Sequence, residues 1–202
     1  MPAAPPSADQ LAVLALLWAL WACPHSLLLQ EGLRARLQAA LGLRPAVYRL
    51  LYSLFSIISI LPVLMYLHIL GGVRPYFWPV PWLALQAALV LAALGIFGWA
   101  SGSFSRGGVD LFGWRQAMSA REPEPRLVEA GVYAHLRHPM HLAGVILLWA
   151  RGLGPADLAT SLLLTLYIVL GTRHEERRLR RQFGQAYVDY AARVPVIPGL
   201  PW

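Results

Sequence analysis

The residues best suited to chemistry in this chain lie in HLRHPMHLAG, residues 135–144, directly before an apolar run. Proline is favoured at the first position of a helix, so Pro139 places His138 at the N-cap and Arg137 just outside it. The first backbone N–H groups of such a helix have no helical acceptor, and the helix dipole is positive there. With the arginine they favour a carboxylate or phosphate ligand. The alternative is that Arg137 and His138 only anchor the helix to lipid headgroups.

Two carboxylates lie in the basic tail after the last apolar stretch, RHEERRLRRQFGQAYVDYAARVPVIP, residues 173–198. The tail predicts a helix whose apolar face is formed by Leu179, Phe183, Ala186 and Tyr190. At roughly 100° per residue, Glu175 and Glu176 flank this face on its two sides. Glu176 can pair with Arg180 at i+4 on an exposed surface, which would account for one glutamate. A second carboxylate at a membrane boundary needs a partner to stay charged, and a cationic ligand is a candidate.

The two charged sets would lie at the two ends of one helical hairpin, on the same side of a membrane. A zwitterionic α-amino acid group would satisfy both of them, because it carries a carboxylate and an ammonium. S-adenosylmethionine carries such a group and adds a positively charged sulfur. The pairing of the two sets therefore predicts S-adenosylmethionine as a cofactor.

Composition places these residues in a membrane protein. Hydrophobic residues make up 57% of the 202 residues, against about 45–50% in ordinary soluble domains. Apolar stretches of membrane-segment length are Leu11–Leu29, Val47–Leu70, Trp82–Ala100 and Pro139–Thr172. The last is too long for one span and is interrupted at Gly152, Gly154 and Pro155. We therefore expect it to form a helical hairpin, which gives about five transmembrane helices.

The basic residues predict the orientation. All 17 are arginine, and 15 of them fall in the segments 30–49, 101–138 and 173–202, which lie on one side of a five-span chain. The positive-inside rule then places the N-terminus outside and the C-terminus inside. We expect an all-α, multi-pass helical bundle in the inner membrane, one domain over residues 1–202, with a cytosolic C-terminal helix and an active site facing the cytoplasm. The exclusive use of arginine favours bidentate anion contacts, although genomic base composition would produce the same bias.

Two long motifs resemble those of a known family. They are GVYAHLRHPMHLAG, residues 131–144, and HEERRLRRQFGQAYVDYAARVPVIP, residues 174–198. Both resemble the paired C-terminal motifs of the integral-membrane methyltransferases, which include isoprenylcysteine carboxyl, phospholipid and methanethiol S-methyltransferases and the NnrU-type proteins. The further stretches HSLL, YRLLYSLFSIISILPVLMYL and VDLFGWRQ look most like the methanethiol S-methyltransferase and NnrU branches. The resemblance covers about the whole chain.

The resemblance implies an enzyme that uses S-adenosylmethionine to methylate a small or lipophilic thiol. The cofactor contacts that it implies are Tyr133, Arg137, His138, His141, Gly144, Glu175 or Glu176, Tyr187 and Tyr190. The chain departs from the pattern where His141 replaces the usual Tyr and Ala143 the usual Gly, with Gly144 one residue later. A missing glycine would crowd a backbone that approaches the cofactor. The alternatives are a carboxyl or amine methyltransferase acting on an isoprenylcysteine or a phospholipid, and a non-catalytic membrane accessory protein.

A thiol reacts as its thiolate, so a base or a nearby positive charge would help. The candidates for this catalytic role are His25 in the first span and His141 one turn into the fourth, although either can be a buried histidine that only bonds backbone. Arg115 is a third candidate, directed at a phosphate, a carboxylate or lipid headgroups. It lies in the segment 110–116 of the glycine-rich loop 101–136. We expect this segment either to close over the site or to lie on the membrane surface.

The sequence also predicts that the protein has no metal site and does not bind nucleic acid. No metal site is expected, because the histidines lack H-E-x-x-H spacing and Cys23 is the single cysteine. No nucleic acid is expected, because no basic stripe is interleaved with aromatic residues in a soluble region. The expected partners are the lipid membrane and a substrate that enters from the bilayer.

Overall fold

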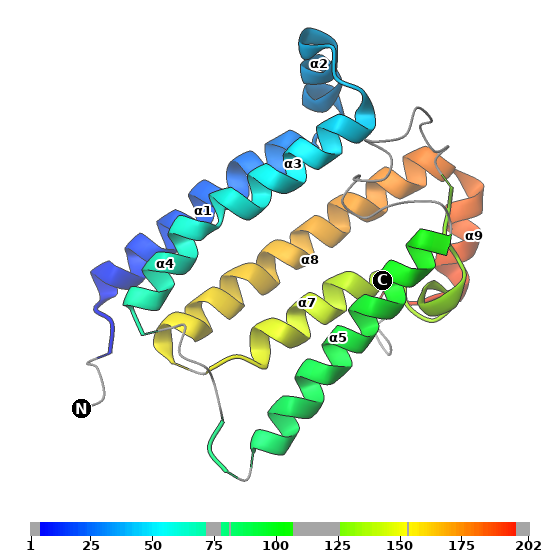
Figure 1. Cartoon of the computed structure of the whole chain (residues 1–202). Coiled ribbons are helices and arrows are strands. Elements are labelled where there is room, and N and C mark those ends of the chain that lie inside the picture. The colour runs from blue at the N-terminus through cyan, green and yellow to red at the C-terminus, as the bar shows by residue number, and fades with distance from the viewer. Residues whose placement is uncertain (1–4, 72–77, 81, 107–125, 153, 197–202) are drawn as a thin grey trace. The chain divides into compact units, whose positions relative to one another are not determined.

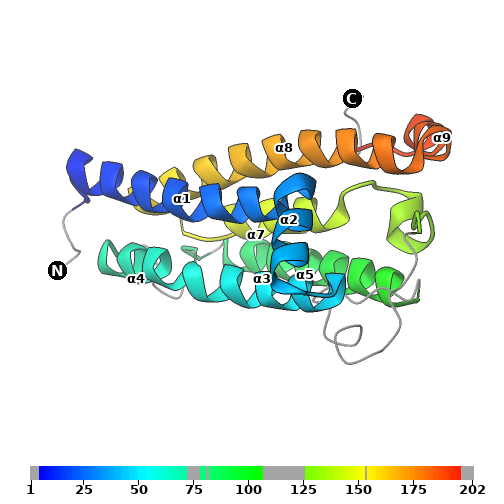
Figure 2. The same cartoon turned by 90° about the horizontal axis from the view of Figure 1, so that it is seen from above.

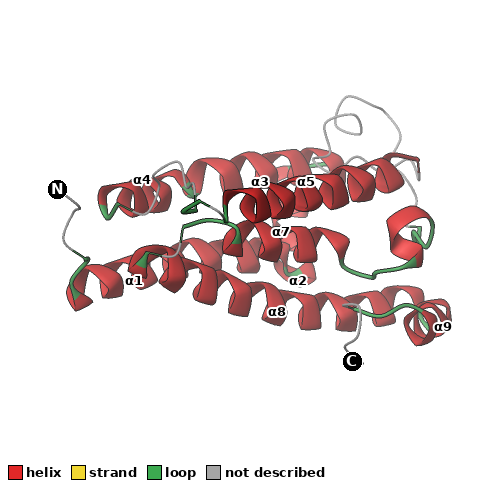
Figure 3. Cartoon of the chain, turned by 90° about the horizontal axis from the view of Figure 1, so that it is seen from below, coloured by secondary structure: helices red, strands yellow, loops and turns green. Residues whose placement is uncertain are grey.

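The computed structural model describes residues 5–71, 78–80, 82–106, 126–152 and 154–196. Every regular element in these ranges is helical (Figure 3). The all-α prediction is therefore confirmed for this part of the chain. The contacts divide the chain into two compact units, which are described separately.

The first unit contains the first four helices and the start of α8, up to Thr160. The four helices are α1 (Ala8–Leu29), α2 (Glu31–Leu41), α3 (Pro45–Ser59) and α4 (Leu61–Ile69). α1 begins with a capping box, in which Ser7 and Gln10 each accept a hydrogen bond from the other's backbone N–H. α3 and α4 follow each other and lie beside α1 (Figures 1 and 2). The sequence did not predict α2, whose residues are too polar and too few to resemble a span.

The second unit contains α5, a short 3-10 helix η1, α7, the rest of α8, and α9. Their bounds are α5 (Leu83–Arg106), η1 (Gly131–Ala134), α7 (Pro139–Trp149), α8 (Pro155–Phe183) and α9 (Gln185–Arg193). α7 packs against α5 and lies between α5 and α8 (Figure 1). It runs antiparallel to α8, because Trp149 Nε1 donates to Thr165 Oγ1 at 3.0 Å while His141 Nδ1 lies 2.9 Å from Thr172 Oγ1. This is the predicted hairpin.

Four helical stretches in the described residues are long and apolar enough to cross a membrane: Ala8–Leu29, Pro45–Ile69, Leu83–Ser103 and Pro155–Phe183. Their large apolar side chains remain exposed, among them Leu20 at 61%, Met65 at 67% and Leu91 at 69%. Apolar surface of this extent is stable in lipid and costly in water. The chain is therefore a multi-pass membrane protein.

α7 is the shortest of the five segments that were predicted to cross the membrane. Its 11 residues reach about 16 Å at 1.5 Å per residue, roughly half of a hydrocarbon core of about 30 Å. The predicted N-out, C-in orientation requires five crossings, so it depends on whether the α7 segment reaches across the bilayer. That orientation stays a prediction.

The basic tail differs from the single helix predicted for it. α8 continues out of its apolar part through Phe183, and Gly184 then adopts a φ of +56°, which favours glycine and separates α9 from α8. Because the helical register does not continue through Gly184, Ala186 is exposed instead of lying on the apolar face. Tyr187, Tyr190 and Val194 form a buried cluster against which Leu179 and Phe183 pack.

Gly131, the first residue of η1, has a conformation and surroundings that only glycine suits. Its φ is +68°, and a Cβ at this position would overlap Ser103 Oγ. We therefore expect Gly131→Ala to lower the free energy of unfolding by about 1–3 kcal/mol. The measurement is thermal unfolding in detergent. Gly171→Ala, where a Cβ would meet nothing within 4 Å, is the matched control and should be neutral or slightly stabilising; an unchanged midpoint for Gly131→Ala would contradict the expectation.

Candidate functional site

A group of charged side chains, which we call the charged cluster, meets at the start of α7 in the second unit. Arg137 and His138 come from the loop before α7, Glu175 and Glu176 from α8, and Tyr187 from α9. The exposed fractions of Arg137, His138 and Glu176 are 5%, 7% and 8%, and charged groups are buried to this degree only when they are paired. The structure therefore brings together the residues of the two sequence motifs.

Glu176 lies at the centre of this cluster. Its Oε1 atom accepts hydrogen bonds from His138 Nε2 at 2.7 Å and from Tyr187 Oη at 2.5 Å. Its Oε2 atom pairs with Arg137 Nη1. The predicted i+4 partner Arg180 also reaches Oε2, at 3.6 Å, with a side chain that is 52% exposed. Glu176 is thus a buried carboxylate, and its pairing with Arg180 is not an ordinary surface ion pair. Its Oε2 atom is the oxygen that a group on the exposed side can reach.

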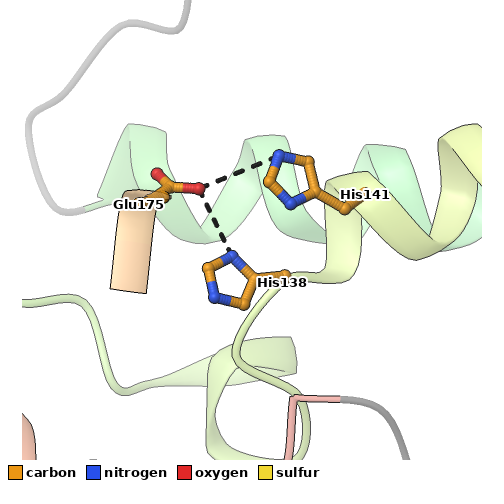
Figure 4. A group of neighbouring side chains, drawn as sticks. All are labelled: His138, His141 and Glu175. Carbon is orange, nitrogen blue, oxygen red and sulfur yellow. Dashed lines mark ion pairs between the residues drawn. The ribbon is translucent and has the colours of Figure 1, made fainter. Parts of the chain in front are cut away.

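His138 and His141 lie one turn apart with parallel rings, whose centroids are 5.2 Å apart and whose planes differ by 2°. Both rings face Glu175 (Figure 4): its Oε2 atom lies 3.3 Å from His138 Nδ1 and 3.8 Å from His141 Nε2. The other oxygen, Oε1, accepts a hydrogen bond from Arg178 Nη2 at 3.5 Å. The two glutamates therefore have different surroundings, although they are adjacent in sequence.

The hydroxyl of Thr172 fixes the proton position on His141. Thr172 Oγ1 donates to the carbonyl oxygen of Ile168 at 2.8 Å, since a carbonyl can only accept. It therefore accepts a hydrogen bond from His141 Nδ1, at 2.9 Å. In the neutral ring this leaves a lone pair on Nε2, the atom that faces the Glu175 carboxylate. A cation or a proton between these two atoms would stabilise this arrangement.

The electrostatics of His138 and of the two tyrosines of α9 follow from burial and from the carboxylates. Burial lowers the pKa of His138, but the hydrogen bonds to Glu175 and Glu176 and their charges outweigh it, and the pKa lies above its ordinary value. Burial, followed by the hydrogen bond to Glu176, raises the pKa of Tyr187. Burial raises the pKa of Tyr190 to about 12. Both phenols therefore stay protonated and act as donors.

The C-terminal residues hold the loop that carries Arg137. The backbone N–H of Arg137 donates to the carbonyl of Pro195 at 3.0 Å, and Tyr190 Oη donates to the carbonyl of Tyr133 at 2.7 Å. Burial, followed by the charge of Glu175, raises the pKa of the Tyr133 phenol. Through its bond to the carbonyl of Tyr133, the hydroxyl of Tyr190 therefore holds the backbone of the segment before Arg137. The carbonyl of Pro195 is a contact that sequence reasoning missed, because a backbone acceptor leaves no residue-type signal.

The Nε atom of Arg137 is buried, and its N–H has no hydrogen-bond acceptor among the described atoms. A buried N–H without an acceptor costs roughly 1–3 kcal/mol. An anionic ligand group beside the guanidinium would satisfy this donor, as the helix-start argument from the sequence expected.

Gly144 and Ala143 lie on α7. A Cβ at Gly144 would meet Ile168 Cδ1 at 3.7 Å, which is an ordinary contact, so no neighbour in the described part of the chain requires glycine there. Ala143 is fully buried. A cofactor contact at Gly144 stays a prediction.

His25 lies in the first unit, on α1. Tyr52 Oη is 2.7 Å from its Nε2 and Ser56 Oγ is 3.1 Å from its Nδ1. The ring of Trp21 stacks on it, with centroids 4.6 Å apart and planes 26° apart. Both ring nitrogens therefore have hydrogen-bond partners between two apolar helices, which is the arrangement of a structural histidine. A role of His25 as a base stays a prediction.

Two other expectations concern the central loop. Arg115, and with it the segment 110–116 that was expected to close over the site, lies outside the described residues. Their roles stay predictions.

One group of histidine and glutamate side chains in the described residues has the spacing for a metal ion. The donor atoms of His138, His141 and Glu175 all lie within 4.8 Å of one another. We expected no metal site from the sequence, because no H-E-x-x-H motif is present and the chain has one cysteine. This set combines two histidines at i, i+3 with a carboxylate from another helix, which a local motif does not detect.

Comparison with known proteins places the chain in a wider group. Residues 13–199 match the sequence profile of the NnrU protein family. The chain is 28% identical to methanethiol S-methyltransferase 1 of Bradyrhizobium diazoefficiens over 97% of its own length and 68% of that protein. It is 29% identical to methanethiol S-methyltransferase of Mycobacterium tuberculosis over 98% of its own length and 81% of that protein. No solved structure matches the chain.

Proposed function

The chain belongs to the NnrU family, and we propose that it is a membrane methyltransferase that uses S-adenosylmethionine to methylate the sulfur of a small or lipophilic thiol. The family match and the two relatives confirm the resemblance found in the sequence motifs. The activity in the relatives' names, methanethiol S-methylation, supports the choice of a thiol over a carboxylate or an amine. S-adenosylmethionine supplies a methyl group bound to a positively charged sulfur.

The observation that carries the proposal is the buried pair of Arg137 and Glu176. The Nε atom of Arg137 lacks an acceptor in the described structure and would hold the cofactor's carboxylate. Oε2 of Glu176, which Arg180 contacts at 3.6 Å from the exposed side, would hold the ammonium in place of Arg180. An arginine and a carboxylate fixed side by side thus match the two charges of one amino-acid group.

Glu176 is the better candidate of the two glutamates for this contact. Tyr187 and His138 hold its Oε1 atom, so the position of its Oε2 atom is fixed before any ligand binds. Glu175 is directed at the two histidines instead. A carboxylate held in advance loses less side-chain freedom on binding, which favours affinity. The role of Tyr187 in this proposal is therefore to position Glu176.

The test is calorimetric titration of S-adenosylmethionine into the detergent-solubilised full chain in the presence of a metal chelator. The parent protein should bind the cofactor. Arg180→Ala should bind it several-fold more tightly, because the competing guanidinium is removed. A folded parent that binds no S-adenosylmethionine would exclude every version of the methyltransferase proposal.

Product formation then separates the substrate classes. Methanethiol and longer thiols should be methylated, whereas a farnesylcysteine analogue and phosphatidylethanolamine should not. Methylation of only the farnesylcysteine analogue or of only the lipid would favour the carboxyl or amine alternative. Cofactor binding without any methylated product would favour a non-catalytic accessory protein.

A further inference from the structure

His138, His141 and Glu175 form a second group of side chains next to the residues that would contact the cofactor (Figure 4). His138 Nδ1, His141 Nε2 and Glu175 Oε2 lie within 4.8 Å of one another there. Without an ion, His138 Nδ1 donates its proton toward Glu175 Oε2 at 3.3 Å. Arg178 contacts the other oxygen of Glu175, Oε1, so the described partners of Oε2 are the two histidine rings. An ion between the three atoms would replace the proton on His138 Nδ1, which would pass to water, and each of the three atoms would then offer a lone pair to the ion.

Each of the three side chains is held by a second partner on its far side. His138 Nε2 donates to Glu176 at 2.7 Å, and His141 Nδ1 donates to Thr172 at 2.9 Å. Oε1 of Glu175 is bound by Arg178 at 3.5 Å. Histidine ligands of metal ions regularly donate their other ring N–H in this way, because the bond fixes both the tautomer and the orientation of the ring. His138 Nδ1 and His141 Nε2 are thereby both turned toward Glu175.

The distances suit a small divalent ion. Metal–ligand bonds of about 2.0–2.1 Å place the donor atoms of a tetrahedral site about 3.4 Å apart. His138 Nδ1 and Glu175 Oε2 are already 3.3 Å apart. His141 Nε2 is 3.8 Å from the same oxygen, and the three donor atoms lie within 4.8 Å of one another. The His141 ring would have to turn out of its parallel stack with His138 to complete the set.

We propose that His138, His141 and Glu175 bind one divalent transition-metal ion, zinc by preference, and that an open position on this ion binds the thiol substrate as a thiolate. Two histidines and one glutamate form a three-ligand set that leaves zinc a fourth position for water or substrate. Magnesium and calcium prefer sites made of oxygen ligands only. The ion site stands on the geometry alone, whereas the identity of the fourth ligand rests on the proposed function.

The ion would promote the deprotonation that a thiol substrate needs before its sulfur can accept a methyl group. When the thiol binds, its S–H bond breaks, the proton passes to water, and the electron pair on sulfur forms the bond to the ion. A thiol that coordinates such an ion is deprotonated at neutral pH. The site then needs no protein base, and His141 is a ligand of the ion and not a general base.

Zinc binding to the metal-stripped full chain, without cofactor, tests the first part. Competition against a chromophoric chelator should show one zinc ion per chain, with much weaker binding of magnesium. His141→Ala should weaken zinc binding by about 100-fold or more, and Thr172→Val by about 10–100-fold, since it removes only the outer partner of His141. Thr172→Ser keeps the hydroxyl and should restore the affinity. His174→Ala changes an exposed neighbour on α8 and is the matched control, with no expected effect.

The outcomes of that titration are decisive even if His141→Ala fails to fold. At the buried position 172, Thr172→Val keeps the size of the side chain and removes the hydroxyl, whereas Thr172→Ser keeps the hydroxyl and removes the methyl group. Parent protein without a tight zinc site would overturn the proposal. So would equal zinc affinities of Thr172→Val and Thr172→Ser, or a loss in His174→Ala as large as in His141→Ala.

Addition of methanethiol to the cobalt-loaded protein tests whether the thiolate binds the ion. Methanethiol should produce a sulfur-to-cobalt charge-transfer band in the near ultraviolet, and methanol should not. A cobalt spectrum that methanethiol leaves unchanged would overturn the thiolate contact. Because cofactor binding is measured with chelator present and ion binding without cofactor, failure of the ion proposal is distinct from failure of the proposed function.

Discussion

Replacing Glu176 with alanine should lower the free energy of unfolding by about 3–5 kcal/mol. The guanidinium of Arg137 is 5% exposed and pairs with this carboxylate. Removal of one partner of a buried ion pair leaves the other charge without compensation in a poorly solvated place, and the donors of Tyr187 and His138 lose their acceptor as well. The measurement is the midpoint and enthalpy of thermal unfolding in detergent.

Glu129→Ala is the matched control for this substitution. Glu129 also accepts from an arginine, Arg193, at 2.9 Å, but the two side chains are 41% and 68% exposed. An exposed pair of this kind contributes about 0–1 kcal/mol, so the control should change stability very little. Equal losses in Glu176→Ala and Glu129→Ala would show that Glu176 is not the buried centre of the cluster.

Arg137→Lys should weaken S-adenosylmethionine binding by about 10–100-fold, as expected for the loss of a hydrogen bond between charged groups. Lysine keeps the positive charge but offers a single ammonium in place of a planar fork of N–H donors. It can compensate Glu176 or contact a ligand carboxylate, but it lacks the Nε donor that remains without an acceptor in the described structure. Calorimetry on the folded variant measures the change.

Arg193→Lys is the control, because it makes the same exchange at an exposed ion pair. Its cofactor affinity should equal that of the parent protein. Parent-like affinity of a folded Arg137→Lys variant would mean that the arginine fork has no part in cofactor binding.

The apolar segments could be predicted well from the sequence, because lipid-facing helices satisfy their backbone hydrogen bonds internally and need only sufficient apolar length. The polar elements could not. α2 and the separation of α9 at Gly184 depend on local backbone conformation, and the 11-residue α7 depends on where the loop before Pro139 ends. The apolar run alone did not reveal that α7 is shorter than a bilayer is thick.

The members of the charged cluster could also be predicted. Arg137, His138 and the two glutamates are unusual residue types beside apolar helices, and the family resemblance implied Tyr187. Their exact pairing could not, since it depends on tertiary contacts. Thr172 lies three residues before Glu175, on the same face of α8, and this spacing was a signal that could have identified it. The carbonyl of Pro195 left no such signal. The proposed metal ligands His138, His141 and Glu175 were not predicted as a set, because Glu175 lies on a different helix from the two histidines.

The most direct measurement on this protein compares S-adenosylmethionine with its decarboxylated analogue, which keeps the sulfonium and the ammonium. If Arg137 binds the carboxylate of the cofactor, the analogue should bind the parent protein about 10–100-fold more weakly. In Arg137→Lys the two ligands should differ far less, because the contact is already lost. Equal affinities of the parent protein for the two ligands would contradict the assignment of the cofactor's amino-acid group to Arg137 and Glu176.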